Sequence, residues 1–459
     1  MKPKQALKWI KEFEMKRDGL NHNVDGVDCW PVIRNTILSI VLPKSGQGAG
    51  AGFNFSIYSI ISIAKSIKDT LSIKNINVFI LSDQKFSETV SGSIYLKDAH
   101  VIREMEQHNS KVPIIALQNM LKDNNIVGRE YCRSIFIVLL LAAGVSKFSA
   151  VMRYIPSIST YVEGIAKELS DSPMLRESSI SYAVLKKQLY RNILFCLVAK
   201  NIFSFILRRA KPEKAYVVCY YSVLGMALTA ACRQQNIPIT DIQHGVAGGS
   251  MRAYASWNKV PENGYSTLPD TFFCWTKYDA NAITAWAKGT PHHNAFVVGS
   301  LWRDYVMSNC LFMTSEKQWL KFFNEVSSFN KKVLITLQSS SLPNLFFEVI
   351  TQSRKNYCFL IRSHPGFPLR ADEIHNKLKK NYPNVFFEEP SNIPIQVLMK
   401  HIDVHLTEWS GAVVDAYFEG VKSIVVAESA LDYFEYYISE GDVLYASTLS
   451  EIQNIIEQC

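Results

Sequence analysis

Three polar side chains that can bind or react with a ligand follow an apolar strand in the middle of the chain. Asp241, Gln243 and His244 stand in the stretch ITDIQHGVAGG, which ends in three closely spaced glycines. Apolar residues alternate with Asp241 and Gln243, so these two polar side chains share one face of the strand. The glycines would let the main chain approach a ligand closely. The alternative is a buried polar network that braces a turn, and the stretch alone favours neither interpretation.

Guanidinium, imidazole and hydroxyl groups follow three strands in the C-terminal part of the chain. Arg362 and His364 stand in RSHPGFP, just past a strand end, where the first proline turns the chain. Ser410, in LTEWSGAVVDAYFEG, is expected at the N-cap of the next helix, where free N–H groups favour an anion. Ser339, in LQSSS, follows a third strand. A single histidine or serine is more often structural, but three such loops at one edge of a parallel sheet predict a phosphate pocket.

The chain lacks the residue patterns that commonly hold a catalytic metal. No Asp-x-Asp occurs, and the nine cysteines are scattered singly, without a Cys-x-x-Cys pair. Such cysteines are typical of small core residues rather than of a disulfide framework or a zinc site. We therefore expect no metal and no cofactor, so that His, Ser and helix N-termini must neutralise the phosphate. A ligand with one phosphate suits such a site better than a diphosphate.

Short apolar segments alternate with amphipathic helices along both halves of the chain, which indicates an α/β protein with parallel sheets. The pattern predicts two Rossmann-like doubly wound domains facing a central cleft, with ligands at the carboxyl ends of the strands. The first domain spans 1–315, with a mostly helical block at 131–210, and the second spans 316–459. The predicted strands are 77–83, 113–118, 215–221, 238–243, 271–276 and 295–300 in the first domain, and 332–338, 357–364, 384–389, 403–408, 423–428 and 442–447 in the second.

Charge and hydropathy narrow the range of partners. The net charge of +8 comes from 49 basic and 41 acidic residues that are dispersed along the chain, and no nucleic-acid-binding motif occurs, so no nucleic acid is expected. The charged start of the chain predicts an amphipathic helix rather than a signal peptide, and hence a cytoplasmic protein. The apolar run 135–145 is too short to span a bilayer. The basic amphipathic stretch 191–211 fits either a packed helix or peripheral contact with the cytoplasmic face of the inner membrane.

Four motifs together resemble those of the retaining β-Kdo glycosyltransferases of bacterial capsule and O-antigen polysaccharide synthesis. They are WPVIR (30–34), DIQHG (241–245), RSHP (362–365) and TEWSGAVVDA (407–416). The order and spacing of the last three are more specific than any single motif, and the resemblance covers about residues 25–445. The His-Pro and serine motifs are also similar to those of bacterial sialyltransferases, which use CMP-activated acidic keto sugars.

The resemblance implies a GT-B fold, a CMP-Kdo donor, no metal, and a double displacement that retains the anomeric configuration. The acceptor would be an oligosaccharide or lipid-linked glycan. By motif, Asp241 would be the nucleophile, His244 would assist it, and Gln243 would contact the substrate. Glu163, in TYVEGIAKEL, is the acceptor-side acid/base by its order along the chain.

The same resemblance places the donor in the C-terminal domain. His364 and Ser410 would contact the CMP phosphate, and the other donor contacts would come from Arg362, Ser339, Gly411 and Asp415. The chain departs from the pattern here. Relatives tend to have paired serines followed by Glu-Ala, whereas this chain has Ser410-Gly411 and Asp415-Ala416.

Two other functions stay open at this point. One is a GT-B transferase that uses a UDP- or CDP-linked donor. The other is a catalytically inactive scaffold of a polysaccharide assembly complex. Retention of Asp241, His364 and Ser410 together argues against the scaffold, because a scaffold has no need of a polar cleft.

Overall fold

The computed structural model divides the chain into two compact units, Met1–Gly299 (unit 1) and Ser300–Cys459 (unit 2). The predicted boundary at 315/316 lies further along the chain. Helices α11 (Leu301–Ser308) and α12 (Met313–Val326) belong to unit 2, where Phe322 and Phe323 of α12 are buried in a core cluster with Leu334. The residues that the structure describes are 3–17, 20–42, 57–90, 92–107, 113–117, 125–147, 156–176, 180–247, 251, 253–309, 313–364, 378 and 381–459.

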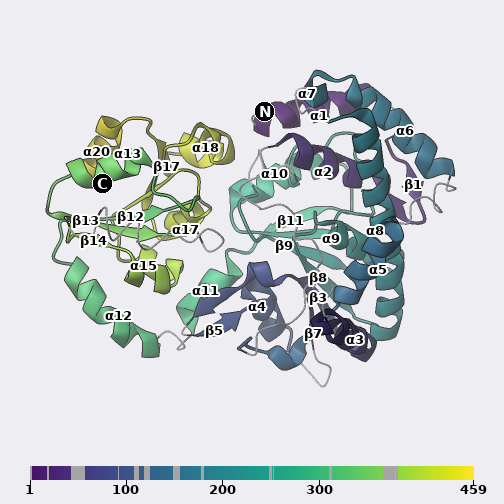
Figure 1. Cartoon of the computed structure of the whole chain (residues 1–459), viewed down its shortest axis with the longest axis horizontal. Coiled ribbons are helices and arrows are strands. Elements are labelled where there is room, and N and C mark those ends of the chain that lie inside the picture. Colours follow the sequence, from purple (N-terminus) through teal and green to yellow (C-terminus); the bar gives the residue numbers. More distant parts are fainter. Residues whose placement is uncertain are drawn as a thin grey trace. The chain divides into compact units, whose positions relative to one another are not determined.

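Unit 1 is built on a parallel sheet of seven strands in the order β11-β10-β9-β8-β3-β6-β7 (Figure 1). All neighbouring strands in it pair in parallel. Such strands are buried on both faces, which explains their apolar runs. The strands are β3 (Val78–Ser82), β6 (Ile114–Leu117), β7 (Cys132–Ser134), β8 (Lys214–Val218), β9 (Ile239–Ile242), β10 (Thr271–Cys274) and β11 (Asn294–Val297).

The other elements of unit 1 are helices and two small antiparallel hairpins. The hairpins are β1 (Asn23–Val24) with β2 (Val27–Asp28), and β4 (Glu88–Val90) with β5 (Ser93–Tyr95). The helices are α1 (Pro3–Lys16), α2 (Cys29–Val41), α3 (Ile57–Ser72), α4 (Lys97–Met105), α5 (Phe136–Lys147), α6 (Pro156–Ser170), α7 (Pro173–Arg176), α8 (Tyr182–Ala210), α9 (Val223–Gln234) and α10 (Lys277–Ala287), with the short 3-10 helices η1 (Gln84–Phe86) and η2 (Arg129–Tyr131).

The long helix α8 contains the basic amphipathic stretch 191–211 except for its last residue, Lys211, which is the C-cap, and lies inside unit 1. It packs against α2, α5, α6 and α9, and its side chains Ile193, Leu197 and Phe203 are buried. Most of its apolar surface is therefore covered by other helices, as the packed-helix alternative requires. No helix among the described ranges is long and apolar enough to cross a membrane.

The WPVIR motif anchors the start of the chain through a buried ion pair. Arg34 of α2 donates from Nε to Glu14 of α1 at 3.0 Å, and the indole of Trp30 donates to the same carboxylate at 2.9 Å. Arg34 also donates to the main-chain oxygens of Ala255 and Ser256, both at 3.1 Å. The motif thus joins α1 and α2 to the loop that follows β9, and its role here is structural.

Unit 2 is built on a six-stranded parallel sheet in the order β14-β13-β12-β15-β16-β17. The strands are β12 (Lys331–Thr336), β13 (Tyr357–Arg362), β14 (Val385–Phe386), β15 (Val404–Thr407), β16 (Lys422–Val425) and β17 (Val443–Tyr445). Besides α11 and α12, the helices are α13 (Asn344–Gln352), α15 (Glu388–Asn392), α16 (Ile395–Met399), α17 (Ala412–Phe418), α18 (Glu428–Tyr433), α19 (Glu435–Ser439) and α20 (Leu449–Gln458).

Helices cover both faces of the sheet in unit 2. Val333 and Ile335 of β12 enter one hydrophobic cluster, which includes Ile452 of α20, whereas Leu334 between them enters a second cluster with Phe322 of α12. Alternate residues of one strand thus reach opposite cores, as in a doubly wound fold. The prediction of two Rossmann-like doubly wound domains is confirmed.

Candidate functional site

The three predicted phosphate-binding loops leave neighbouring strands at the same edge of the unit 2 sheet. Numbered along the chain within this unit, the strand order is 3-2-1-4-5-6, the order of dinucleotide-binding Rossmann domains. In the sheet register, Thr336 at the end of β12 lies opposite both Arg362 of β13 and Thr407 of β15. The loops that contain Ser339, His364 and Ser410 therefore begin level with one another.

Ser339 and Ser410 follow the two strands at which the direction of winding reverses, β12 and β15. Ligands of open α/β sheets bind at this switch point. The Ser410 hydroxyl accepts from the Ala412 N–H at 3.2 Å, and the residue is 8% exposed. The Ser339 hydroxyl donates to the Ser341 carbonyl at 2.8 Å. The N-cap of α17 is Gly411, which is exposed, rather than the predicted Ser410, because the helix begins one residue later.

Two other residues that were predicted to contact the sugar donor form hydrogen bonds within unit 2. Arg362 donates from Nη1 to the carbonyls of Pro390, at 2.6 Å, and Ile393. It therefore fixes the C-terminal end of α15. Asp415 of α17 accepts from the Gln396 amide of α16 at 3.2 Å. His364 is partly buried two residues past the end of β13, and Pro365 lies outside the described residues.

In unit 1, Asp241 is buried in β9 and both of its oxygens accept hydrogen bonds. The residue is 1% exposed. Oδ1 accepts from the Tyr220 N–H at 3.0 Å and Oδ2 from the Tyr254 hydroxyl at 2.8 Å. Burial raises the pKa of Asp241 to about 7, although these two hydrogen bonds act in the opposite direction. The carboxyl group is thus close to half protonated at neutral pH, and is not fully ionised as an unperturbed aspartate would be.

Gln243 braces the turn after β9, as the alternative interpretation of this stretch proposes. The side chain is 2% exposed. Its amide donates to the Gly245 carbonyl at 2.8 Å, and its oxygen accepts from the Trp275 N–H at 2.7 Å. These bonds tie the end of β9 to the end of β10. The glycines at 248 and 249 lie outside the described residues.

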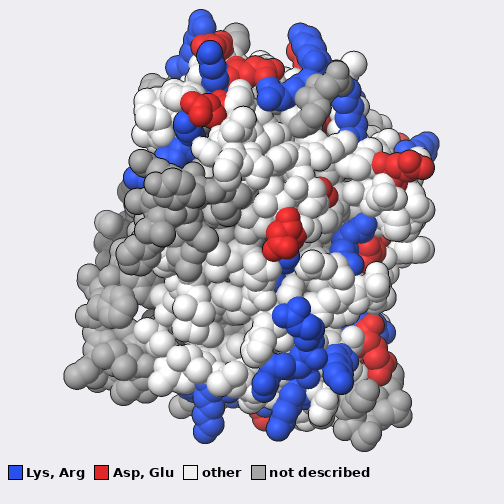
Figure 2. Space-filling model, turned by 90° about the vertical axis from the view of Figure 1, so that its right-hand side faces the viewer, with Lys and Arg blue, Asp and Glu red and all other residues white. Residues whose placement is uncertain are grey.

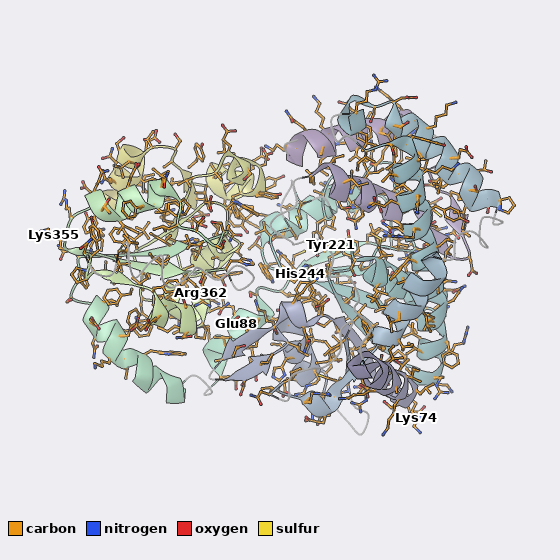
Figure 3. The ribbon with its side chains drawn as sticks, viewed as in Figure 1. Lys74, Glu88, Tyr221, His244, Lys355 and Arg362 are labelled. Atoms are coloured by element: carbon orange, nitrogen blue, oxygen red, sulfur yellow. The ribbon has the colours of Figure 1, made fainter. Side chains whose placement is uncertain are left out.

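His244 lies in a row of aromatic side chains at the carboxyl edge of the unit 1 sheet. Its Nε2 is 3.1 Å from the Tyr221 hydroxyl, and the two rings stack with centroids 5.6 Å apart (Figure 3). On another side its ring centroid is 4.5 Å from that of Phe86. Burial, reinforced by the charge of Lys85, lowers the pKa of His244 to about 3. The imidazole is therefore neutral at physiological pH and offers hydrogen bonds rather than charge.

The turn after β8 places Tyr220 and Tyr221 at this edge. Cys219 has a φ of 72°, in the left-handed region. Gly225 in the first turn of α9 lies against this turn, since a Cβ there would be 2.6 Å from the Cys219 and Tyr220 carbonyl oxygens. The Asn35 amide of α2 donates to the Tyr221 carbonyl at 2.6 Å. These contacts fix the Tyr220 N–H that binds Asp241.

Glu163, the predicted acid/base, lies on an exposed part of α6. Its carboxylate pairs with Lys186 of α8 at 3.1 Å, and its side chain is 56% exposed. The contacts of Asp241 and His244 come from the ends of β3 and β8 and from the loop after β9, and Glu163 belongs to none of these segments. The structure does not bring Glu163 together with the other predicted catalytic residues.

Tyr221, Tyr254, Phe86 and Lys85 belong to this edge but were not predicted. The position of three of them directly after strands β3 and β8 is a signal that the sequence contained. Tyr254 carried no such signal, because it lies 13 positions after Asp241 and is brought to it by the loop.

Metal-binding groups are sparse in the parts of the chain that the structure covers. Within these parts, no three side chains of His, Cys, Asp or Glu are grouped so as to hold a metal ion. Seven of the eight described cysteines are buried, as expected of core residues, and Cys459 is exposed.

Comparisons with known proteins find similar structures but no similar sequence family. No protein-family model and no curated protein sequence matches the chain. Among solved structures, the UDP-GlcNAc 2-epimerase from Neisseria meningitidis bound to UDP-GlcNAc is 16% identical, with 83% of this chain and 91% of that chain covered and a TM-score of 0.49. The 2-epimerase from Methanocaldococcus jannaschii, in complex with UDP-GlcNAc and UDP, is 14% identical (83% and 92% covered, TM-score 0.46). The glycosyltransferase SnogD from Streptomyces nogalater is 12% identical (82% and 88% covered, TM-score 0.40). The fold assignment itself rests on the strand orders of the two sheets.

Proposed function

We propose that this protein is a glycosyltransferase that transfers Kdo or a related keto-sugar acid from a CMP-activated donor to a bacterial surface polysaccharide. The observation that carries the proposal is the placement of polar groups at the switch points of both sheets. Ser339 and Ser410 flank the switch point of unit 2, and the row around His244 lies at that of unit 1. The motif resemblance, rather than the strand order, supplies the identity of the sugar and of the nucleotide.

The donor phosphate is proposed to bind at the carboxyl edge of the unit 2 sheet. The hydroxyl groups of Ser339 and Ser410 and the imidazole of His364 are proposed to contact it. Arg362 acts indirectly, because its guanidinium already binds two carbonyls of the segment 390–393. A site of neutral donors with one imidazole suits the single phosphate diester of a CMP-sugar.

Asp241 is proposed to form the covalent intermediate of a double displacement. Its carboxylate attacks the anomeric carbon while the bond to the CMP phosphate oxygen breaks, and CMP leaves with the bonding electrons. An acceptor hydroxyl then attacks the same carbon, loses its proton to a base, and releases the carboxylate. The buried Asp241 must be uncovered for this reaction, so its hydrogen bond to Tyr254 has to open or turn when the donor binds. The base in the second step is unassigned. The role of Glu163 as this base stays a prediction, because its exposed carboxylate is not brought together with Asp241 and His244.

Peripheral contact with the inner membrane stays part of the proposal. The helices α3, α5 and α8 leave Leu71, Leu141 and Phe205 between 46% and 48% exposed. Figure 2, which views the right-hand side of Figure 1, shows a broad, mostly uncharged surface with basic side chains near its lower end and both basic and acidic side chains near its upper end. Exposed apolar groups flanked by basic ones fit an anionic lipid surface, and co-sedimentation with anionic vesicles but not with neutral ones checks this.

The donor is tested by ligand-induced thermal stabilisation with CMP, UDP and CDP. A ligand present at 100 times its dissociation constant adds about 2.7 kcal/mol to the free energy of unfolding. We expect CMP to stabilise the protein most. Stabilisation by UDP or CDP alone would move the function to a transferase with that donor, and stabilisation by none would favour the inactive scaffold.

The reaction is tested with CMP-Kdo generated in situ and short synthetic acceptors, followed by mass and linkage analysis of the product. We expect one added keto-sugar residue with retained configuration. A product of inverted configuration would reject the covalent mechanism while keeping the transferase.

A further inference from the structure

We infer that Lys85, together with the aromatic row Phe86–His244–Tyr221, forms a subsite in unit 1 for the carboxylate of an acidic sugar. The inference rests on the proposed function in so far as that function supplies such a sugar. The carboxylate could belong to the sugar that is transferred or to the end of the acceptor. Both sources present the same chemistry, a pyranose or furanose ring with an attached carboxylate.

The subsite lies at the switch point of the unit 1 sheet. Strand β3 is the first strand of this sheet along the chain, with β6 and β7 on one side and β8 and the later strands on the other. Lys85 and Phe86 follow β3, and Tyr221 follows β8, so they flank the place where the winding reverses. Open α/β sheets bind their ligands at this place.

The turn after β3 holds Lys85 and Phe86 in position. The Asp83 carboxylate accepts from the Lys85 N–H at 3.0 Å and so caps the 3-10 helix η1. The Lys85 ammonium lies 4.9 Å from the centre of the Phe86 ring, and the Phe86 ring lies 4.5 Å from that of His244. A cation beside a row of rings matches a sugar acid, whose ring CH groups pack on aromatic faces while its carboxylate needs a positive partner.

At this edge, the positively charged ammonium group of Lys85 is accessible to solvent. Its side chain is exposed, and among the described residues no carboxylate forms an ion pair with it. The nearby acids are less available: Asp83 is 7% exposed, and Glu88 faces Lys97 at 3.8 Å with 13% of its side chain exposed. Asp241 is buried under Tyr254. A ligand carboxylate would therefore meet an unpaired ammonium group before it meets any of these acids.

His244 contributes to the subsite as a neutral hydrogen-bonding group. Lys85 and Lys97 both help to lower its pKa, so both ammonium groups act on the imidazole. The neutral imidazole accepts from the Tyr221 hydroxyl through Nε2 and so orients it, and the Tyr221 oxygen can then accept a hydrogen bond from a sugar hydroxyl, whereas the carboxylate is left to Lys85.

The test compares free Kdo with its carboxyl methyl ester by ligand-observed NMR titration of the full chain. We expect the protein to bind the acid more tightly than the ester. Lys85→Gln should weaken binding of the acid about tenfold and leave binding of the ester unchanged, because only the acid makes a charge-assisted contact. Lys85→Arg should retain the preference for the acid.

Lys74→Gln is the matched control. Lys74 is an exposed lysine in the segment that leads into β3, whereas Lys85 follows that strand, and Figure 3 places Lys74 away from Tyr221 and His244. Its substitution removes the same charge and should alter binding of neither ligand. Equal effects of the two substitutions, equal binding of acid and ester by the unmodified protein, or no binding of either ligand would each overturn the inference.

Kinetics then identify the source of the carboxylate. If it belongs to the transferred sugar, Lys85→Gln raises KM for CMP-Kdo and slows its acceptor-independent hydrolysis. If it belongs to the acceptor, the substitution raises only the acceptor KM. Binding of the acid over the ester without any transfer from CMP-Kdo would reject the proposed function but keep the subsite, whereas transfer that is indifferent to Lys85 would reject the subsite alone.

Discussion

Replacement of Asp241 by Asn tests both the burial of this carboxyl group and its proposed chemistry. The pKa of Asp241 in the folded protein is raised from 3.8 to about 7, chiefly by burial. The folded protein therefore keeps this proton between about pH 4 and 7, where the unfolded chain has lost it. The sign follows from linkage: the contribution of Asp241 to stability is greatest below pH 4 and is lost as the pH rises through 7. At about 1.4 kcal/mol per pH unit, the loss amounts to about 4 kcal/mol.

Asparagine has nearly the same shape but cannot ionise, so it avoids this loss. Its side-chain oxygen can accept from the Tyr220 N–H, and its amide can donate to the Tyr254 hydroxyl. We expect Asp241→Asn to be equally or slightly less stable than the unmodified protein at pH 4.5, and clearly more stable at pH 8. The measurement is urea unfolding of both proteins from pH 4.5 to 8. The difference between their free energies of unfolding cancels the contributions of the ionisable groups that the two proteins share. A difference that stays constant over this range would refute the raised pKa.

The same substitution tests the nucleophile. We expect turnover to fall at least about 10³-fold in Asp241→Asn while CMP still stabilises the fold, since only the covalent step is removed. In the unmodified enzyme, turnover should rise with pH through about 7 as Asp241 ionises. Ionisation of His244 should not change turnover between pH 5 and 9, because its pKa lies at about 3. Near-normal turnover in Asp241→Asn would make this stretch a structural brace and place the chemistry elsewhere.

Three further predictions concern other parts of the molecule. His364→Ala should weaken CMP binding by about 1.5–3 kcal/mol through loss of a charge-assisted contact, and unchanged CMP affinity in calorimetry would return His364 to a structural role. EDTA should leave turnover intact, and its loss on chelation with recovery on adding magnesium or manganese would reject the metal-free site. Arg34→Met should lower the free energy of unfolding by about 3–5 kcal/mol, because it leaves the Glu14 carboxylate buried without its positively charged partner. The double variant Glu14→Leu/Arg34→Met should recover part of this loss, and equal stability of the single and double variants would contradict the prediction.

The sheets could be predicted from the sequence because buried parallel strands are continuous apolar runs. Each of the twelve predicted segments overlaps a strand. Strand β7 and the two hairpins were not predicted, since these short strands include polar residues such as Arg133, Asn23 and Glu88 and form no apolar run. The domain boundary also differed, because α11 and α12 are amphipathic helices whose partner cannot be read from their own pattern.

The candidate site could be predicted only where it follows directly from strand ends. Ser339, His364 and Ser410 are of this kind, since a parallel sheet brings the carboxyl ends of neighbouring strands together. The hydrogen bond between Tyr254 and Asp241 depends on the path of a loop, which no periodicity encodes. The two outcomes for Arg362 and Gln243 have a similar origin. Both stand where a ligand would be expected, but their side chains form hydrogen bonds with carbonyl and N–H groups of the protein instead.

The surroundings of Asp241 bear on both halves of the proposed double displacement. Burial raises its pKa and so makes the ionised carboxylate a stronger nucleophile for the first step. In the second step the same carboxylate must leave, and a high pKa makes a carboxylate a poorer leaving group. The Tyr254 hydroxyl, 2.8 Å from Oδ2, can stabilise the departing negative charge by restoring its hydrogen bond. Tyr254→Phe should therefore slow release of the sugar more than its attachment, so that the covalent adduct on Asp241 accumulates and becomes visible by intact-mass spectrometry. Slower adduct formation with no accumulation would instead mean that Tyr254 only holds Asp241 in place.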